Sequence, residues 1–392
     1  MADKLRAAVI GLGPRSLGLI RTYLDVKEIG ITAICDIDET FLREGEKRFA
    51  EFNVHPECYT DHRKLLDEGK IDLAFVNTNW ITHIPVVIDC LEAGIPAASE
   101  VCGAASVQEC WDLVHAWERT RTPLMFMENC CFGRDEMMAL RMAEEGAFGI
   151  VEYLEGAYCH DLRYAFTDPK RHRVIANRVR HGDLYPTHGI GILSKILHVN
   201  CGNRLTAIAS MGSPSNGMAA WFGMKDPDNP LAKKPYACED VTASLIKCAG
   251  GELISLRHSV LLPRPYSRGL LVQGTKGILS EERQGIHLEG IQAEEEWLPF
   301  EKAYALYEHP VWKNYQVPGN DAHGGMDYLT VRAFVTCLTE GRPMPIDAYD
   351  MAAWMSLTPL SAQSIEMGGT PQPIPDFTCG KWAERSQVPF TA

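Results

Sequence analysis

The stretch RAAVIGLGPRSLGLI, residues 6–20, decides the fold of the first third of the chain. A short apolar run is followed at once by Gly11 and Gly13, and Ser16 takes the third place of a GxGxx(G/S) pattern. Glycines at these places make the turn tight and let the backbone approach a pyrophosphate, whose charge lies at the N-terminus of the next helix. The pattern therefore predicts a dinucleotide-binding loop between a strand and a helix.

An acidic residue further along the chain supports this interpretation. The run ITAICDID is predicted to be a second strand ending at Asp36, 23 residues beyond Gly13. A carboxylate there can accept hydrogen bonds from the ribose hydroxyls and repels a 2′-phosphate. We therefore predict NAD rather than NADP, although Arg15 and Arg43 keep NADP open. The alternative is that the glycines only make a tight turn and that Asp36 caps a helix.

Strands and helices alternate up to about residue 128. FLREGEKRFAEF, THIPVVIDCLEAG and VQECWDLVHAWERT have helical spacing, whereas IDLAFVNT, IPAASE and PLMFMEN are strand-like. Such alternation predicts βαβ units and a parallel sheet. We predict an α/β Rossmann domain that binds NAD over residues 1–128, and a second domain over residues 129–392.

The pattern changes after about residue 150. IVEYLEGAY, LTAIASMG, DVTASLIKCA, GELISLRHSV and GLLVQGTKGILS are strand-like, and Gly250-Gly251 signals a hairpin between two of them. These runs predict an α+β domain with an open, mostly antiparallel sheet, one face of which is free to cover a nicotinamide. Two late helical stretches, GGMDYLTVRAFVTCLTEG and DAYDMAAWMSLTPLSAQSIEMG, are predicted to pack back against the body.

The segment HGDLYPTHGIGILSKIL places two polar rings at the start of a helix. Pro186 suits the first helical position, and apolar residues recur at helical spacing after it. Tyr185 would lie at or before the cap and His188 in the first turn, where the helix dipole favours a neutral imidazole able to accept a proton. The alternative is a capping tyrosine and an internally hydrogen-bonded histidine, and spacing alone does not decide between them.

Composition excludes several classes of protein. The 392 residues carry a net charge of −13, which opposes a nucleic-acid partner. Thirteen cysteines in so long a chain with ample apolar residues indicate reduced thiols rather than a disulfide framework. The chain shows neither a secretory signal nor an apolar run of the ~18 residues that a membrane span needs, so we expect a soluble cytoplasmic protein.

Five motifs carry a resemblance to a known family: EGAYCHDLR, GDLYPTHGIG, PRPYSRGLLVQGTKG, HGGMDYL and PDFTCGKW. With them the chain resembles the Gfo/Idh/MocA oxidoreductases, and within these the branch of NAD-dependent glycoside hydrolases typified by α-N-acetylgalactosaminidases. The resemblance runs from the Gly11 loop to Trp382. It implies a tightly bound NAD between a Rossmann domain and a sheet domain, a carbohydrate substrate, and homo-oligomers formed through the open sheet face.

The resemblance also implies redox-assisted glycoside cleavage. A hydride passes from a sugar carbon, usually C3, to NAD⁺, and the new ketone acidifies the hydrogen on C2. The aglycone is then eliminated from C1, water adds, and the hydride returns. This chemistry needs a base at a sugar hydroxyl, for which His or Tyr is suitable, rather than the paired carboxylates of ordinary glycosidases.

The resemblance assigns roles to residues of this sequence. Tyr185, His188 and Glu100 are the catalytic candidates, and Glu100 is also a candidate for the cofactor site. The other cofactor candidates are Gly11, Gly13, Arg15, Ser16, Asp36, Thr78, Trp80 and His83. The substrate candidates are His160, Asp161, Arg163, Tyr266 and His323. Three of these also have structural alternatives, in which His83 caps its helix, Tyr266 is a packed aromatic, and His323 braces Gly324-Gly325.

Two departures from the family pattern bear on function. Val101 stands where simple sugar dehydrogenases have the lysine of an E-K-P segment, which favours the hydrolase branch. Phe132 stands where that branch often has a tyrosine, so a proton donor is lost. The resemblance therefore supports redox-assisted sugar chemistry more strongly than it supports specificity for N-acetylgalactosamine.

The sequence is compatible with three functions. The first is an NAD-dependent glycosidase, the second a sugar dehydrogenase that releases reduced cofactor, and the third a catalytically silent NAD-binding sensor. A metal centre is not expected, because the spacing of Glu128, Cys130, Cys131, His160 and His188 matches no zinc pattern.

Overall fold

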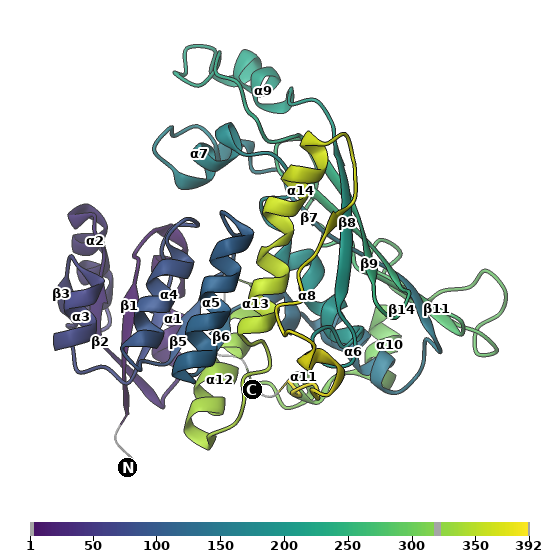
Figure 1. Cartoon of the computed structure of the whole chain (residues 1–392), viewed down its shortest axis with the longest axis horizontal. Helices are drawn as coiled ribbons and strands as arrows, with labels where there is room; N and C mark the ends of the chain where they lie inside the picture. The colour runs from purple at the N-terminus through teal and green to yellow at the C-terminus, as the bar shows by residue number, and fades with distance from the viewer. Residues whose placement is uncertain (1–3, 317–322, 391–392) are drawn as a thin grey trace.

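Two sheets with helices between them form the molecule (Figure 1). The computed structural model describes residues 4–316 and 323–390. The first sheet has six strands in the order β3-β2-β1-β4-β5-β6, and every pairing in it is parallel. The second has nine strands in the order β14-β13-β12-β11-β7-β10-β9-β8-β15, and only the pair β7 and β10 is parallel. The expected Rossmann domain followed by an open, mostly antiparallel sheet is confirmed.

The first sheet alternates with helices as the sequence predicts. Its elements are β1 (Leu5–Ile10), α1 (Pro14–Asp25), β2 (Ile29–Cys35), α2 (Glu39–Ala50), β3 (Glu57–Tyr59), α3 (His62–Glu68), β4 (Leu73–Val76), α4 (His83–Glu92), β5 (Ala97–Ser99), α5 (Val107–Thr120) and β6 (Leu124–Phe126). All four residues of β4 are buried, as expected for a central parallel strand covered on both faces.

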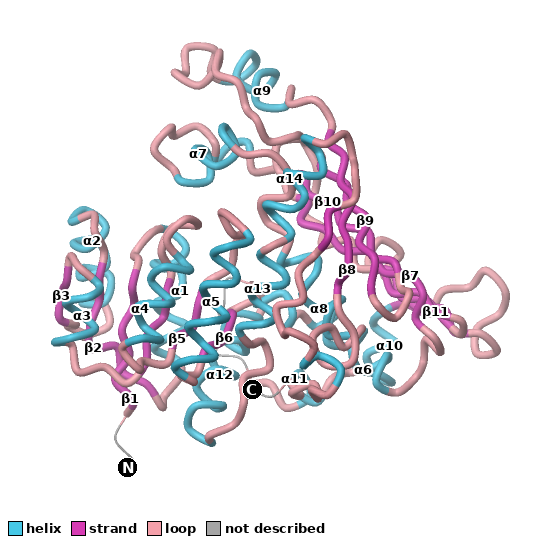
Figure 2. The backbone as a smooth tube through the Cα atoms, viewed as in Figure 1, coloured by secondary structure: helices cyan, strands magenta, loops and turns pink. Residues whose placement is uncertain are grey.

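The second sheet and its helices follow. They are η1 (Asn129–Phe132), α6 (Arg134–Glu144), β7 (Val151–Cys159), η2 (Arg163–Ala165), α7 (His172–Val179), α8 (Thr187–Ile196), β8 (Leu205–Gly212), α9 (Gly217–Lys225), β9 (Thr242–Cys248), β10 (Leu253–Ser259), β11 (Leu271–Gly274), β12 (Gly277–Ser280), β13 (Gly285–Leu288) and β14 (Leu298–Pro299). The chain ends with α10 (Phe300–Tyr307), α11 (Pro310–Lys313), α12 (Met326–Glu340), α13 (Ala348–Met355), α14 (Leu357–Glu366), β15 (Gln372–Pro373) and η3 (Lys381–Ala383). Burial alternates residue by residue along β9, so one face of this sheet packs inward and the other faces outward (Figure 2).

Two glycines let α8 lie directly on the inner face of β7. A Cβ on Gly156 would lie 2.3 Å from the carbonyl oxygen of Gly189, and a Cβ on Gly189 would lie 2.9 Å from the backbone nitrogen of Ala157. Neither position has room for a side chain, so the helix and the strand approach through their backbones. This approach brings the N-terminal turn of α8 beside the end of β7.

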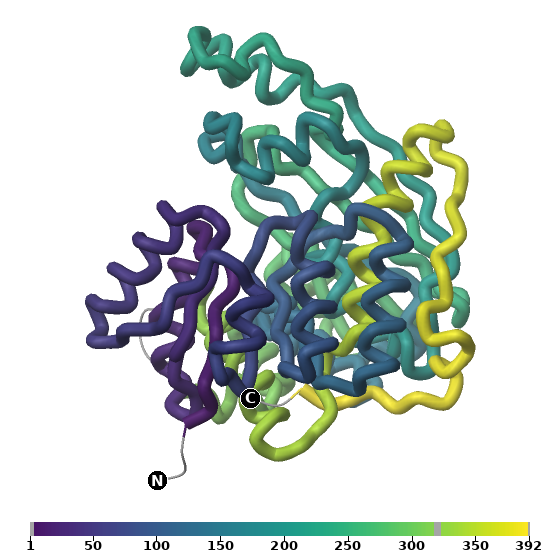
Figure 3. The backbone as a smooth tube through the Cα atoms, turned by 60° about the vertical axis from the view of Figure 1, so that its left-hand side comes forward, coloured from purple at the N-terminus to yellow at the C-terminus, as the bar shows by residue number. Residues whose placement is uncertain are grey.

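Two C-terminal helices pack against helices of the first sheet. Helix α12 lies beside α1, and α13 lies beside α5. Helices α7 and α9, which belong to two separate segments of the chain, both project past the carboxyl end of β1 (Figures 1 and 3).

Three local expectations were wrong. GLLVQGTKGILS is two strands of a hairpin, because the chain turns at Thr275-Lys276 between β11 and β12. The last helical stretch is divided at Ser356 into α13 and α14. Pro186 is the N-cap of α8 rather than its first helical residue, whereas Tyr185 lies just before the cap and His188 in the first turn, as expected.

Two other observations concern the whole described chain. All thirteen cysteines lie in it, and none of them forms a disulfide. Within residues 4–316 and 323–390, no helix has both the length and the apolar character that crossing a bilayer requires.

Candidate functional site

The loop after β1 has the geometry that a pyrophosphate-binding turn requires. Gly11 has a φ of +94°, and a Cβ there would lie 2.6 Å from the backbone of Asn77. Gly13 is the N-cap of α1, and no side chain caps this helix end, so it can receive an anion. Ser16 is buried and accepts a hydrogen bond from Asn77 Nδ2 at 2.9 Å, so it fastens the loop to the end of β4.

Asp36 connects the end of β2 to the same loop. Its Oδ2 accepts the backbone N–H of Leu12 at 2.7 Å, and its Oδ1 accepts the backbone N–H of Asp38 at 2.9 Å. Each carboxylate oxygen has a second lone pair, which leaves capacity for a ribose hydroxyl. Asp38, not Asp36, caps α2, and Arg43 pairs with Glu39 on the surface of that helix.

Arg15 joins the glycine loop to α12. Its guanidinium donates two hydrogen bonds to Asp327, at 2.7 and 2.8 Å, and one to Glu100 Oε1 at 3.2 Å. Burial alone would raise the pKa of Asp327, but hydrogen bonds from Arg15 and His323 hold it far below its usual value. Arg15 is therefore neutralised by two carboxylates, and His323, expected at the substrate, lies with Arg15 and Asp327.

The loop after β4 places its residues between the two sheets. Thr78 Oγ1 lies 3.0 Å from His83 Nδ1, and burial lowers the pKa of His83 to about 3, which keeps its imidazole neutral. His83 is the first residue of α4, whose N-cap is Thr82. Trp80 is 8% exposed, and its ring lies 5.6 Å from that of Tyr185, measured between centroids.

Six rings from four segments meet, and we call them the ring cluster: Trp80, Tyr158, His160, Tyr185, His188 and Tyr266. Tyr185 lies 4.7 Å from both Tyr158 and His188, and His160 lies 5.2 Å from Tyr266. The structure thus brings together the predicted pair Tyr185 and His188 and two of the predicted substrate residues. Tyr158 was missed, although it is only two residues before His160, a spacing that places two side chains on the same face of an extended chain.

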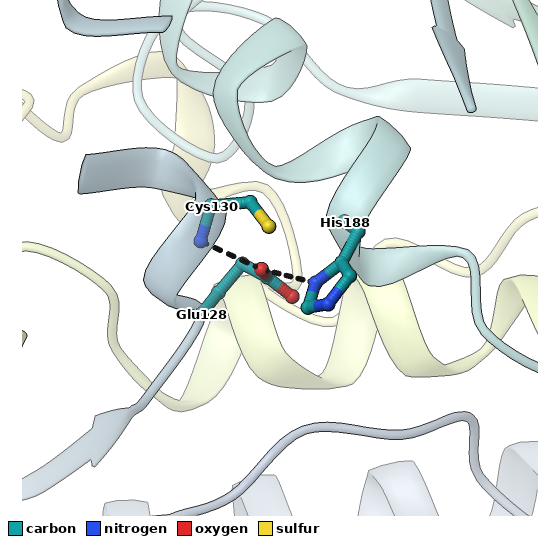
Figure 4. Close-up of side chains that lie close together, drawn as sticks. All are labelled: Glu128, Cys130 and His188. Atoms are coloured by element: carbon teal, nitrogen blue, oxygen red, sulfur yellow. Dashed lines mark hydrogen bonds and ion pairs between the residues drawn. The ribbon is translucent and has the colours of Figure 1, made fainter. Parts of the chain in front are cut away.

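Glu128 fixes the orientation of His188 (Figure 4). Its Oε1 lies 2.6 Å from His188 Nδ1 and also accepts the backbone N–H of Cys130 at 3.1 Å. Burial would raise the pKa of Glu128, but the charge and hydrogen bond of His188 lower it below its usual value, so the carboxylate stays ionised. Because a carboxylate only accepts, Nδ1 carries a proton, and when the imidazole is neutral the lone pair is on Nε2.

Arg173 on α7 is a further residue that the sequence did not indicate. Its guanidinium lies 5.2 Å from the ring centroid of Trp80 and 5.1 Å from that of Tyr185. Burial would lower the pKa of Arg173, but Tyr158 and Tyr185 raise it. Burial raises the pKa of Tyr185 well above that of a free phenol despite this neighbouring cation, so Tyr185 is a neutral hydrogen-bond donor.

The remaining candidates differ in their surroundings. Asp161 and Arg163 form a two-pronged ion pair with each other, at 2.9 and 2.7 Å, just after β7. Tyr266 is 44% exposed and lies at the edge of the ring cluster. Phe132 is fully buried, and its ring packs against Phe390, so this position is not part of the cluster.

Part of the group considered for a metal also meets here. Donor atoms of Glu128, Cys130 and His188 all lie within 4.8 Å of one another. Cys131 instead points at α8, because a Cβ on Gly191 would lie 2.7 Å from its sulfur.

Two family models cover most of the chain. Residues 5–127 match the oxidoreductase family with an NAD-binding Rossmann fold, and residues 132–384 match the C-terminal domain of glycosyl hydrolase 109. An α-N-acetylgalactosaminidase of Tannerella forsythia is 35% identical over 97% of this chain and 88% of its own length. A glycosyl hydrolase family 109 protein of Shewanella sp. strain ANA-3 is 37% identical over 97% of this chain and 87% of its own.

Solved structures share the fold at low identity. Levoglucosan dehydrogenase in complex with NADH and levoglucosan has a TM-score of 0.74 at 19% identity, covering 95% of this chain and all of that one. Scyllo-inositol dehydrogenase from Lactobacillus casei has a TM-score of 0.69 at 14% identity, covering 95% of this chain and 99% of that one.

Proposed function

Because the chain belongs to glycosyl hydrolase family 109, and its first part to the Gfo/Idh/MocA oxidoreductases, we propose that it is an NAD-dependent glycosidase. It would oxidise a sugar at C3, eliminate the aglycone from C1, add water and reduce the sugar again. The observation that carries this proposal is the 5.6 Å approach of Trp80 to Tyr185, because it joins the loop of the Rossmann sheet to the ring cluster.

The residues at the carboxyl end of β1 and β2 fit NAD. Gly11 and the uncapped N-terminus of α1 suit a pyrophosphate, and Asp36 suits a ribose with free hydroxyls. Arg15, held by Glu100 and Asp327, is not free to bind a 2′-phosphate, which supports NAD over NADP. Bound NAD⁺ would supply reversible hydride acceptance, and a cofactor that is regenerated in each cycle can stay tightly bound.

His188 is the proposed base. Glu128 holds the proton on Nδ1, so the Nε2 lone pair can take the proton of the C3 hydroxyl as this carbon is oxidised. His188 is only 11% exposed, so a sugar in contact with it would be largely shielded from water. Glu128 would orient the imidazole of His188, and the imidazole would accept the proton of the substrate hydroxyl, as in other sites where a third group orients the base.

Tyr185 is the proposed hydrogen-bond donor. Its raised pKa keeps the phenol protonated, so it can donate to the oxygen on C3 when that carbon becomes a carbonyl. The same donor would stabilise the enolate that forms when C2 loses its proton. Arg173 adds positive charge beside that oxygen, and Glu100 acts from the cofactor side through Arg15.

The carbohydrate would lie between Trp80 and the residues His160 and Tyr266. Rings and imidazoles at this place offer stacking surfaces and hydrogen bonds to a neutral sugar. Asp161 and Arg163 would approach the same sugar from the loop after β7.

We further propose that two copies associate through the outer face of the nine-stranded sheet. Leu245 on β9 is 51% exposed and Met211 on β8 is 67% exposed, and both lie on the face that helices leave open. Unpaired thiols throughout the described chain fit a reducing compartment such as the cytoplasm.

The test is a panel of chromogenic glycosides assayed with and without added NAD⁺, while the absorbance of reduced nicotinamide is followed. The proposal expects steady release of the chromophore without net accumulation of NADH. Stoichiometric NADH from a free sugar would instead identify a sugar dehydrogenase. A protein that binds NAD⁺ and does neither would be a sensor.

A further inference from the structure

We infer that Glu128, Cys130 and His188 form an inhibitory binding site for Zn²⁺ inside the proposed catalytic pocket. The three side chains come from η1 with its N-cap and from the first turn of α8, which the backbone brings together (Figure 4). Their donor atoms lie within 4.8 Å of one another. A carboxylate, a thiol and an imidazole are the donor types that zinc prefers.

The second carboxylate oxygen of Glu128, Oε2, is suited to bind a cation. Glu128 Oε1 accepts hydrogen bonds from His188 and from the backbone of Cys130. Oε2 is fully buried and no described donor meets it in hydrogen-bond geometry, although the hydroxyl of Thr187 lies close enough to this carboxylate to lower its pKa. An unpaired oxygen of an ionised carboxylate is costly inside a protein. A metal ion bound to this oxygen would remove that cost.

The charges of the site balance with a divalent ion. Glu128 and Cys130 are 0% and 2% exposed, and the side chain of His188 is 11% exposed. Zn²⁺ bound by a carboxylate, a thiolate and a neutral imidazole has no net charge, which suits a site excluded from water. The thiol proton of Cys130 leaves as the metal binds.

The bound metal would stop catalysis through His188. In a neutral imidazole one nitrogen carries the proton and the other carries the lone pair. Whichever nitrogen binds Zn²⁺, the ring has no lone pair left to accept a proton from a sugar hydroxyl. The inhibitory role thus rests on the proposed function, whereas the metal site itself does not.

Spectroscopy with Co²⁺ tests the site without any substrate. The NAD-loaded protein is titrated with Co²⁺ alone, and a thiolate-to-cobalt charge-transfer band is expected in the near ultraviolet. Cys130→Ala should abolish the band and weaken Zn²⁺ binding at least about tenfold in calorimetry, because loss of even an outer-shell partner of a metal ligand costs that much. Cys131→Ala is the matched control, because that buried neighbour points elsewhere and should keep both signals.

Inhibition is measured as the ratio of activity with and without Zn²⁺, so that any change in basal rate cancels. Zn²⁺ should inhibit the wild type and Cys131→Ala, and Cys130→Ala should resist at least about tenfold more metal. A wild type without the cobalt band, or a band that survives Cys130→Ala, overturns the site. A band in a protein that cleaves no glycoside would leave the site standing and remove the proposed function. Glycoside cleavage by a protein that shows no cobalt band would support the proposed function and overturn the metal site.

Discussion

The proton between Glu128 and His188 decides which nitrogen of this imidazole can act as a base. In Glu128→Gln the amide oxygen can still accept from Nδ1 and from the backbone N–H of Cys130, but the negative charge that stabilises the imidazolium formed when Nε2 takes a proton is lost. We expect kcat for the best glycoside to fall by about 10²- to 10⁴-fold, the usual contribution of a general base, with a smaller change in KM. Steady-state kinetics over a range of pH measures this.

A second histidine–carboxylate pair provides the control. His62 Nε2 lies 2.7 Å from Asp89 on the helical surface of the first sheet. Asp89→Asn disrupts the same kind of pair away from the ring cluster, so its kcat should match the wild type. Equal losses in Asp89→Asn and Glu128→Gln would show that the effect is not specific to His188.

Asp183 makes the stability of this region depend on pH. It is 4% exposed, and burial raises its pKa to about 7. The unfolded chain releases this proton near pH 4, so between about pH 4 and pH 7 the folded protein binds more protons, and stability falls as pH rises through that window. Asp183→Asn keeps an acceptor for the N–H of Tyr185 but cannot ionise.

We therefore expect the fall in Tm from pH 5 to pH 8 to be smaller in Asp183→Asn than in the wild type, by at least about 2 °C. Differential scanning calorimetry measures both transitions. The exposed Asp228 serves as the control, because the Tm of Asp228→Asn should fall from pH 5 to pH 8 as much as that of the wild type. A fall in Asp183→Asn as large as that of the wild type would contradict a protonated Asp183.

Residue chemistry was predictable where a local pattern carried it. Tyr185 and His188 followed from one motif, and Tyr158 could have been predicted because it is two residues before His160 and so shares its face in an extended chain. Glu128 and Arg173 were not, because each meets the rings from an element distant in sequence. His323 was assigned to the sugar, whereas a carboxylate on the next helical turn holds it near Arg15.

At the scale of elements, the position of α8 depends on Gly189, which has no side chain. Gly189→Ala would place a methyl group 2.9 Å from the backbone of β7, which cannot move without disturbing its strand pairs. We expect a loss of about 1–3 kcal/mol in the free energy of unfolding, and a fall in kcat as His188 moves with its helix. Denaturant melts and kinetics on the same sample test both.

The control is another helical glycine. Gly223 in α9 has open space where its Cβ would be, so Gly223→Ala should be neutral or stabilising by up to about 1 kcal/mol. If Gly189→Ala and Gly223→Ala changed the free energy of unfolding by the same amount, helix propensity rather than the contact with β7 would explain the result.

Elements with a clear period were predicted well, and those divided by local turns were not. The βαβ alternation predicted the strands and helices of the first sheet except the short β3 and α3, for which no pattern was recognised. The hairpin at Thr275-Lys276 was hidden because the apolar residues on both sides read as one run. The break at Ser356 lacks a glycine, so only packing on the body reveals it.

At the scale of the whole molecule, the outer sheet face should join two copies. Leu245→Glu would place a charge in the centre of that interface, and we expect the dimer of the wild type to dissociate into monomers. Sedimentation velocity measures the masses. Ile291→Glu, on an exposed loop between β13 and β14, is the matched control and should remain dimeric. A monomeric wild type would contradict the proposed interface.

The order of the two domains could be predicted, but their mutual arrangement could not. It depends on long-range contacts such as Arg15 with Asp327, 312 residues apart, and Trp80 with Tyr185. No local pattern encodes such pairs. They nevertheless determine whether a sugar held by the rings can reach a nicotinamide.

Cleavage in deuterated water tests the proposed mechanism most directly. Oxidation at C3 followed by elimination requires the hydrogen on C2 to leave and a solvent proton to replace it. Mass spectrometry and NMR of the released sugar should therefore find one deuterium on C2. Release of a sugar without deuterium on C2 would contradict the proposed mechanism.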